Sequence, residues 1–270
     1  MTAVRPAAVA GMFYPGDPAA LAAQVAACLR EAAPSQTGSR VPKALIAPHA
    51  GYVYSGPVAG SAYARLAPLR GRIRRVVLAG PAHRVFVKGA AVPAATAFAT
   101  PLGAVALDEE AIAALRRLAF VETSDAAHAR EHSLEVHLPF LQSVLGEFRL
   151  VPVVVGGATP AQVARLLETV WGAGETLVVA STDLSHFLPY PAAARRDRET
   201  AEAIVRRAGP LDGEQACGAA VVNGLIEVAR ARDLQVELVD LRSSGDTAGG
   251  RDRVVGYGAF LVFEPVSADG

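Results

Sequence analysis

Short, uniformly apolar runs alternate along this chain with longer stretches in which apolar residues recur at helical spacing. The runs at 44–47, 76–79, 150–155 and 177–180 have almost no polar positions, which is typical of strands buried on both faces of a sheet. Strands that alternate with helices predict an α/β fold, layered α/β/α, with a mixed, largely parallel central sheet. Some antiparallel strands are expected because spacers such as 246–254 are too short for a helical crossover.

Helix start signals and apolar periodicity place helices between these runs. Asp17 followed by Pro18 is a capping carboxylate before a proline at the first helical position. Further helices are predicted from Pro57 to about Leu66, over 191–208 and over 213–232. Residues 85–107 alternate poorly and contain several Gly and Pro residues, so short antiparallel pieces or a hairpin are expected there.

Three of the apolar runs end in a loop that carries a histidine. The run at 44–47 is followed by His49, the run at 76–79 by His83, and the run at 177–180 by Asp183 and His186. Later, Asp246 follows the apolar segment at 236–241. Because the loops after buried parallel strands gather at one sheet edge, we expect these side chains to converge there.

Two imidazoles and one carboxylate form the ligand set of a non-haem Fe(II) site that keeps positions open for substrate and oxygen. His49, His83 and Asp246 are therefore the candidate metal ligands. The same residues would also hold Zn(II), which activates water, so the donor types alone do not choose the metal. His186 is then free for acid/base work, oriented by Asp183 or by a neighbouring backbone group.

The remaining histidines, His128, His132 and His137, lack this position at the end of an apolar run. A satisfied structural role is the more frequent one for such residues. His132 and Glu135 are nonetheless assigned, together with Tyr54 beside the His49 loop, to the lining of the substrate pocket. On a continuous helix His137 would point well away from His132, so the two are not expected to form a ligand pair.

Length and composition favour one compact domain over residues 1–270. Hydrophobic residues make up 51% of the chain, and 26 Lys and Arg balance 26 Asp and Glu. This neutral balance provides no basic field for nucleic acid, so no nucleic-acid partner is expected. No apolar run reaches membrane-spanning length and no signal core is evident at the amino terminus, so no membrane association and a cytoplasmic location are expected. Cys28 and Cys217 are too few for a disulfide framework, and both are expected to be buried.

Segments spread over nearly the whole chain match one known family in order. They are Arg5–Pro6, Ala10–Pro15, Pro48–Gly56, Gly80–His83, Glu131–Pro139, Ser181–His186 and Val255–Tyr257. In these segments the sequence resembles the Memo family, whose bacterial and archaeal members are called AmmeMemoRadiSam system protein B. The resemblance implies a fold related to class III extradiol dioxygenases and a pocket that corresponds to their non-haem iron site.

Carried onto this chain, the resemblance matches His49 and His83 to metal-binding histidines and His186 to an acid/base histidine. The animal Memo protein has a cysteine as its third ligand, and the corresponding position here is assigned to Asp246. An Asp oxygen suits a harder ion than a thiolate does, which favours Fe(II), with Cu or Zn as alternatives. Family neighbours imply, by association, a functional link to radical-SAM and AMMECR-type proteins.

The sequence therefore predicts a metal-binding protein with a dioxygenase-like pocket, an oxidoreductase acting on a small molecule of unknown identity. Two alternatives stay open. One is a non-catalytic binding or scaffold protein that keeps a vestigial pocket, and the other is a Zn-dependent hydrolase.

Overall fold

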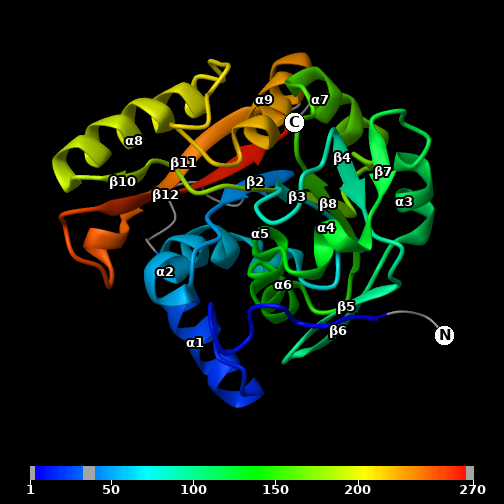
Figure 1. Ribbon diagram of the computed structural model, residues 1–270, viewed down its shortest axis with the longest axis horizontal. Coiled ribbons are helices and arrows are strands. Elements are labelled where there is room, and N and C mark those ends of the chain that lie inside the picture. Colours follow the sequence, from blue (N-terminus) through cyan, green and yellow to red (C-terminus); the bar gives the residue numbers. More distant parts are fainter. Residues whose placement is uncertain (1–3, 33–39, 266–270) are drawn as a thin grey trace.

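The computed structural model describes residues 4–32 and 40–265, and it shows a mixed sheet with helices packed on both faces (Figure 1). The sheet runs in the order β10-β12-β2-β9-β3-β8-β4-β7, and β11 also pairs with β12. Its strands are β10 (His186–Leu188), β12 (Val254–Phe263), β2 (Ala44–Ala47), β9 (Thr176–Ser181), β3 (Arg75–Pro81), β8 (Arg149–Val155), β4 (Ala90–Val92), β7 (Val121–Thr123) and β11 (Gln235–Ser243).

The centre of the sheet is parallel and its margins are mixed. Strands β2, β9, β3 and β8 are parallel neighbours, whereas β12 runs antiparallel to β2, β10 and β11, and β4 runs antiparallel to β8. The central strands are almost entirely buried, which explains their unbroken apolar sequences. The predicted α/β class with a mixed sheet is confirmed.

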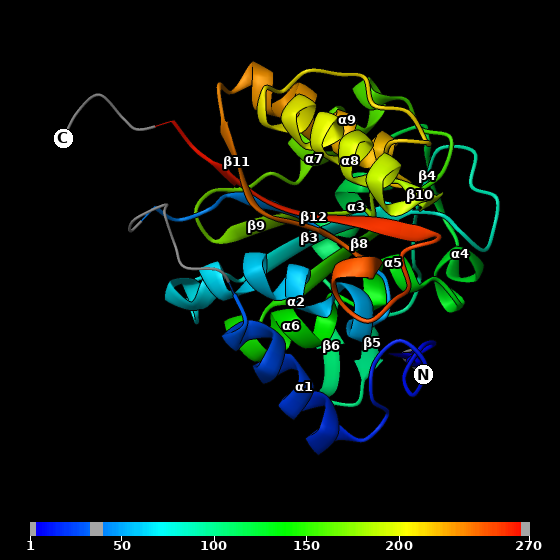
Figure 2. The same ribbon diagram turned by 90° about the vertical axis from the view of Figure 1, so that its left-hand side faces the viewer.

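Helices cover both faces of the sheet, as the edge-on view shows (Figure 2). One face carries α7 (Pro160–Thr169), α8 (Tyr190–Val205) and α9 (Ala219–Ala231). The other carries α1 (Pro18–Arg30), α2 (Tyr52–Tyr63) and α6 (Leu138–Leu145). Shorter elements are η1 (Ala64–Leu69), α3 (Glu109–Leu115), α4 (Asp125–Ala129), α5 (His132–Glu135) and η2 (Ser244–Asp246).

The predicted start of α1 is confirmed, whereas the predicted starts of α2 and α9 are shifted. Asp17 caps α1 by accepting from the Ala20 N–H, as predicted. The helix predicted to begin at Pro57 begins at Tyr52, because the Ser55 N–H already donates to the Gly51 carbonyl. Pro57 lies inside α2 and removes only one helical hydrogen bond there. Helix α9 begins at Ala219, six residues after the predicted start at 213.

The segment 85–107 does contain the expected hairpin. Strands β5 (Ala97–Thr100) and β6 (Gly103–Ala106) pair antiparallel, and β1 (Val4–Arg5) adds to β5 to complete a small second sheet. This pairing holds the amino-terminal arm beside the main sheet. No helix in the described ranges 4–32 and 40–265 is long and apolar enough to cross a bilayer.

A close backbone approach brings α5 against β3. A Cβ atom at Gly80 would lie 2.9 Å from Ser133 Oγ and from a methyl group of Leu134. A larger residue at position 80 would therefore have to displace the side chain of Ser133 or Leu134. Both elements lead directly to histidines of the site described next.

Candidate metal centre

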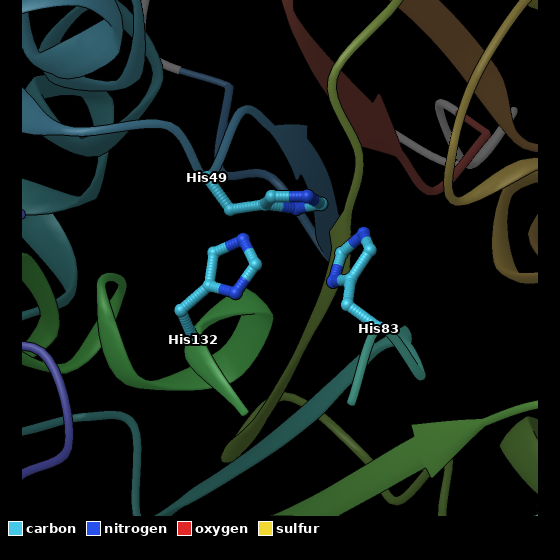
Figure 3. A group of neighbouring side chains, drawn as sticks. All are labelled: His49, His83 and His132. Atoms are coloured by element: carbon cyan, nitrogen blue, oxygen red, sulfur yellow. The ribbon is translucent and has the colours of Figure 1, made fainter. Parts of the chain in front are cut away.

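Three histidines meet beyond the carboxyl ends of the parallel strands (Figure 3). His49 follows β2, His83 follows β3, and His132 is the first residue of α5. One nitrogen from each ring lies within 4.8 Å of the other two. The ring centroids are 5.2 Å apart for His49 and His83, 5.4 Å for His49 and His132, and 4.7 Å for His83 and His132. We call this group the three-histidine centre.

His49 is the most deeply buried member of the centre, with 2% of its surface exposed. Its Nδ1 atom lies 2.6 Å from Ser181 Oγ, and its backbone N–H donates to Asp183 Oδ1 at 2.8 Å. Burial lowers the pKa of His49 well below its usual value, and neighbouring histidines add to that shift. The ring is therefore neutral, and Nε2, with the Cys217 sulfur near it, is the nitrogen that could bind a ligand.

The carboxylate of Glu131 holds His83 in a defined orientation. Its Oε1 atom lies 2.9 Å from His83 Nδ1, and Oε2 accepts from the His83 backbone N–H at 2.6 Å. Glu131 also accepts from the backbone N–H groups of His132 and Ser133, as the N-cap of α5. Burial opposes its ionisation, but the hydrogen bonds from His83 and Ser133 outweigh burial and lower its pKa to about 2. A carboxylate that fixes Nδ1 leaves Nε2 of His83 open, as behind many metal-binding histidines.

His132 supplies the observation that tests whether a metal fits. Its Nδ1 atom is buried without a hydrogen-bond partner, although it lies 3.3 Å from Glu131 Oε1. Burial lowers the pKa of His132 to about 4, against the opposing effect of Glu131. Because Nδ1 faces the same Glu131 oxygen that holds Nδ1 of His83, Nε2 of His132 is the nitrogen left for a ligand. Together with Nε2 of His49 and Nε2 of His83, it makes a donor set that fits a divalent metal ion.

A thiol lies beside the centre. Cys217 Sγ is 3.4 Å from His49 Nε2 and accepts from the Asp183 N–H at 3.3 Å. Burial, followed by the nearby Asp183 carboxylate, raises the pKa of Cys217 to about 12, so the sulfur carries its hydrogen at neutral pH. Cys28 is fully buried as expected, whereas Cys217 is only partly so. The sequence did not indicate that Cys217 adjoins the site.

His186 and Asp183, predicted as acid/base residue and orienting residue, do not contact each other through their side chains. His186 Nδ1 lies 2.8 Å from the Leu184 carbonyl, so a backbone group orients the ring. Burial lowers the pKa of His186, and the charge of His83 lowers it further, so His186 is electrostatically coupled to the centre. Asp183 instead binds the His49 backbone, and burial raises its pKa to about 7. The acid/base role of His186 stays a prediction.

Asp246, the predicted third ligand, is not in the three-histidine centre; His132 is. Asp246 closes the short helix η2, where Oδ2 accepts from the backbone N–H and the hydroxyl of Ser243, each at 2.9 Å. Its Oδ1 accepts from Tyr190 OH at 2.6 Å. Both oxygens are thus engaged locally in a turn of Ser-Ser-Gly-Asp sequence.

The two other predicted pocket residues have different surroundings. Tyr54 lies in the first turn of α2 with 40% of its surface exposed. Glu135 is fully buried and binds the amino-terminal arm. It accepts from the guanidinium of Arg5, the backbone N–H groups of Ala8 and Val9, and the Tyr14 hydroxyl. These contacts give Glu135 a structural role, and we call Arg5, Tyr14 and Glu135 the amino-terminal anchor.

The two remaining histidines lie outside the three-histidine centre, although His128 Nδ1 is also buried without a hydrogen-bond partner. His128 Nε2 lies 3.1 Å from the Ala91 carbonyl, and His137 lies between Tyr63 OH and Ser181 Oγ at 2.8 Å from each. The region read as one helix is broken into α4, α5 and α6. The angular relation drawn for a continuous helix therefore does not apply, although His137 is indeed outside the centre.

A small cavity borders the centre. It has a volume of about 280 Å³ and is lined mainly by apolar and small residues. Pro81 and Ala82 from the His83 loop form one side, and Cys217, Gly218 and Val221 form another. None of the three histidines lines this cavity, but Cys217 contacts His49 and Ala82 directly precedes His83.

The fold and centre together define an α/β protein with a histidine cluster suited to a metal ion at the carboxyl edge of its parallel strands. The family model described as Memo-like protein matches residues 5–261, and the chain belongs to this family. A MEMO1 family protein of Methanopyrus kandleri is 36% identical over 278 residues, which cover 95% of this chain and 98% of that protein. One from Ignicoccus hospitalis is also 36% identical, over 285 residues, with 95% and 97% covered. An uncharacterised protein from Escherichia coli K12, known from a crystal structure, aligns at 18% identity with a TM-score of 0.49, over 79% of this chain and 98% of that chain.

Proposed function

We propose that this protein binds one divalent metal ion through His49, His83 and His132 and uses it to act on a small molecule. The observation that carries the proposal is the convergence of the three histidines, with one ring nitrogen from each lying within 4.8 Å of the other two. Three protein donors leave coordination positions for a substrate. A bound ion would supply Lewis acidity or redox chemistry at that point.

We favour Fe(II) and an oxidoreductase with a dioxygenase-like pocket as the first candidate. Imidazole nitrogen is a good donor for Fe(II), and three donors leave room for both oxygen and a substrate. The adjacent cavity of about 280 Å³ is large enough for a small molecule only. His186, coupled electrostatically to His83, is the proposed residue for moving protons, because its ring is half-buried and near the centre.

Zn-dependent hydrolysis is the second candidate, and one observation favours it. All three members of the group are histidines, and three histidines are also the ligand set of a known class of catalytic zinc sites. A bound zinc ion would lower the pKa of water, and such activity would not need oxygen.

A metal and oxygen experiment separates these candidates. The metal content of protein from its native source is measured first, and metal-free protein is then offered Fe(II) anaerobically or Zn(II). We expect one equivalent of metal to bind, and binding to be lost in His49→Ala. Oxygen uptake with a panel of small aromatic and apolar compounds would support the oxidoreductase, and ester cleavage independent of oxygen would support the hydrolase. Metal binding without either reaction would favour a binding or scaffold protein, and no binding of either metal would overturn the proposal.

Cellular context is proposed on sequence grounds. We place the protein in the cytoplasm, and we propose a functional link to radical-SAM and AMMECR-type proteins from family association. Fractionation of native cells, and co-purification tested with a tagged chain, would examine both. No nucleic acid or membrane is included among the proposed partners.

A further inference from the structure

Ser181, the last residue of β9, has three hydrogen-bonding neighbours and is completely buried. Its Oγ atom lies 2.6 Å from the Ser133 carbonyl oxygen, 2.6 Å from His49 Nδ1 and 2.8 Å from His137 Nε2. A serine hydroxyl has one hydrogen to donate and two lone pairs with which to accept. Three neighbours therefore use its whole capacity, and the direction of each bond can be deduced.

The carbonyl of Ser133 decides that direction. A carbonyl oxygen only accepts, and two oxygens 2.6 Å apart need a hydrogen between them, so Ser181 must donate to Ser133. No hydrogen is then left for either imidazole. His49 Nδ1 and His137 Nε2 must both carry a hydrogen and donate to Ser181.

The far side of His137 agrees with this assignment. With its hydrogen on Nε2, His137 has a lone pair on Nδ1, which lies 2.8 Å from Tyr63 OH. Tyr63 is fully buried and keeps its hydrogen, because burial raises its pKa. The phenol therefore donates to Nδ1, and each atom in the row from Tyr63 to His49 has one consistent role.

We propose that Ser181 is a positioning residue that fixes His49 in the tautomer with hydrogen on Nδ1, so that Nε2 carries the lone pair on the side of Cys217 and the three-histidine centre. The Glu131 carboxylate holds His83 in the same way, by accepting a hydrogen bond from Nδ1 of His83. A neutral hydroxyl thus does for His49 what a carboxylate does for His83. The consequence for metal affinity rests on the proposed function, whereas the tautomer itself does not.

The same two serines also hold the three histidine-bearing segments together. Ser133 donates from Oγ to the Pro81 carbonyl, two residues before His83, and from its backbone N–H to Glu131. Ser133 follows His132 directly, and its carbonyl receives the hydrogen of Ser181. The Ser133–Ser181 contact therefore links the loops of His49 and His83 to α5.

Nuclear magnetic resonance on metal-free protein tests the tautomer directly. Histidine labelled with ¹⁵N is incorporated, and long-range proton–nitrogen correlations distinguish protonated from unprotonated ring nitrogens. His49 is assigned from the signals lost in His49→Gln. We expect Nδ1 protonated and Nε2 unprotonated; a hydrogen on Nε2, or an averaged mixture, would overturn the proposal. This measurement is made on the unaltered protein, so it decides the tautomer even if Ser181→Ala does not fold.

Variants then test the role of the hydroxyl. In Ser181→Ala we expect the His49 signals to shift to a tautomer mixture, and Zn²⁺ affinity to fall about 10- to 100-fold. Tyr63→Phe should leave the His49 tautomer unchanged, because the Ser133 carbonyl still takes the serine hydrogen. Ser61→Ala is the matched control, since Ser61 is equally buried but binds Asp240 and the Pro57 carbonyl.

The two proposals fail in different ways. A fixed His49 tautomer in a protein that binds neither Fe(II) nor Zn²⁺ would remove the proposed function and leave the role of Ser181 intact. A protein that binds metal, and whose His49 tautomer is unchanged in Ser181→Ala, would remove the role of Ser181 and leave the proposed function intact.

Discussion

Two buried carboxylates one helical turn apart, Glu131 and Glu135, serve two different regions of this molecule. Glu131 binds ring and backbone atoms of the three-histidine centre, whereas Glu135 binds the amino-terminal anchor. Both residues are almost completely buried and lie at the two ends of α5. The two carboxylates are equally buried, so their different roles follow from the groups that donate hydrogen bonds to them.

The amino-terminal anchor is a closed network. Both oxygens of Glu135 accept two hydrogen bonds, and Arg5 uses its remaining nitrogens on the carbonyls of His128 and Glu131. The three-histidine centre is open by comparison, since among the described residues no hydrogen bond reaches Nε2 of His83 or Nε2 of His132. A saturated ionic network stabilises a fold, whereas under-partnered nitrogens leave capacity for a ligand.

The largest expected effect is a loss of stability when the ion pair of the amino-terminal anchor is removed. Glu135→Gln removes the charge that faces Arg5 and leaves a guanidinium buried without a counter-charge. Breaking one side of a buried ion pair costs about 3–5 kcal/mol, so the free energy of unfolding in urea should fall by that amount. Glu168→Gln is the control, because its partner Arg232 is exposed and such pairs contribute about 0–1 kcal/mol. Equal losses in the two variants would mean that the anchor is not the stabilising network described.

The next effect concerns the ligands of the centre. His132→Ala should lower Zn²⁺ affinity at least about 100-fold, because it removes a donor rather than a supporting group. Asp246→Ala should change that affinity little, since Asp246 is engaged with Ser243 and Tyr190. Calorimetric titration of both variants measures the difference. A large loss in Asp246→Ala with little change in His132→Ala would restore the carboxylate as third ligand.

Local sequence patterns predicted much of the fold and two members of the centre. Buried parallel strands are uniformly apolar, so their ends could be located, and residues that follow such ends gather at one edge. This reasoning brought His49 and His83 together, as the structure does. This reasoning could not predict His132 as a member of the centre, because His132 begins a short helix and does not follow a buried strand.

The place of α5 depends on contacts distant in sequence. Gly80 and Ser133 allow its first turn to lie against β3, and Glu131 joins it to the His83 loop. The clue in the sequence was the acidic residue directly before His132, which caps α5 and orients a neighbouring ring. Asp246 illustrates the opposite case, in which a residue predicted as a metal ligand lies in a capped turn outside the three-histidine centre.

The smallest expected effect is a pH dependence that distinguishes a structural histidine from the centre. Burial lowers the pKa of His128 to about 4, whereas the unfolded chain has the ordinary value of 6.5. Between these values the unfolded state binds a proton that the folded state does not, so stability falls as pH falls from 6.5 towards 4 and is fully present above 6.5.

Replacing His128 by Gln keeps a donor for the Ala91 carbonyl and removes this titration. The slope of unfolding free energy against pH should become shallower by about 1.4 kcal/mol per pH unit between pH 6 and 4.5. Urea unfolding at several pH values measures both slopes, in metal-free protein and with Zn²⁺ present. The change should be the same in both conditions, because His128 is outside the centre. A change seen only with Zn²⁺ would show that His128 is coupled to metal binding, and the division between structural and ligand histidines would have to be redrawn.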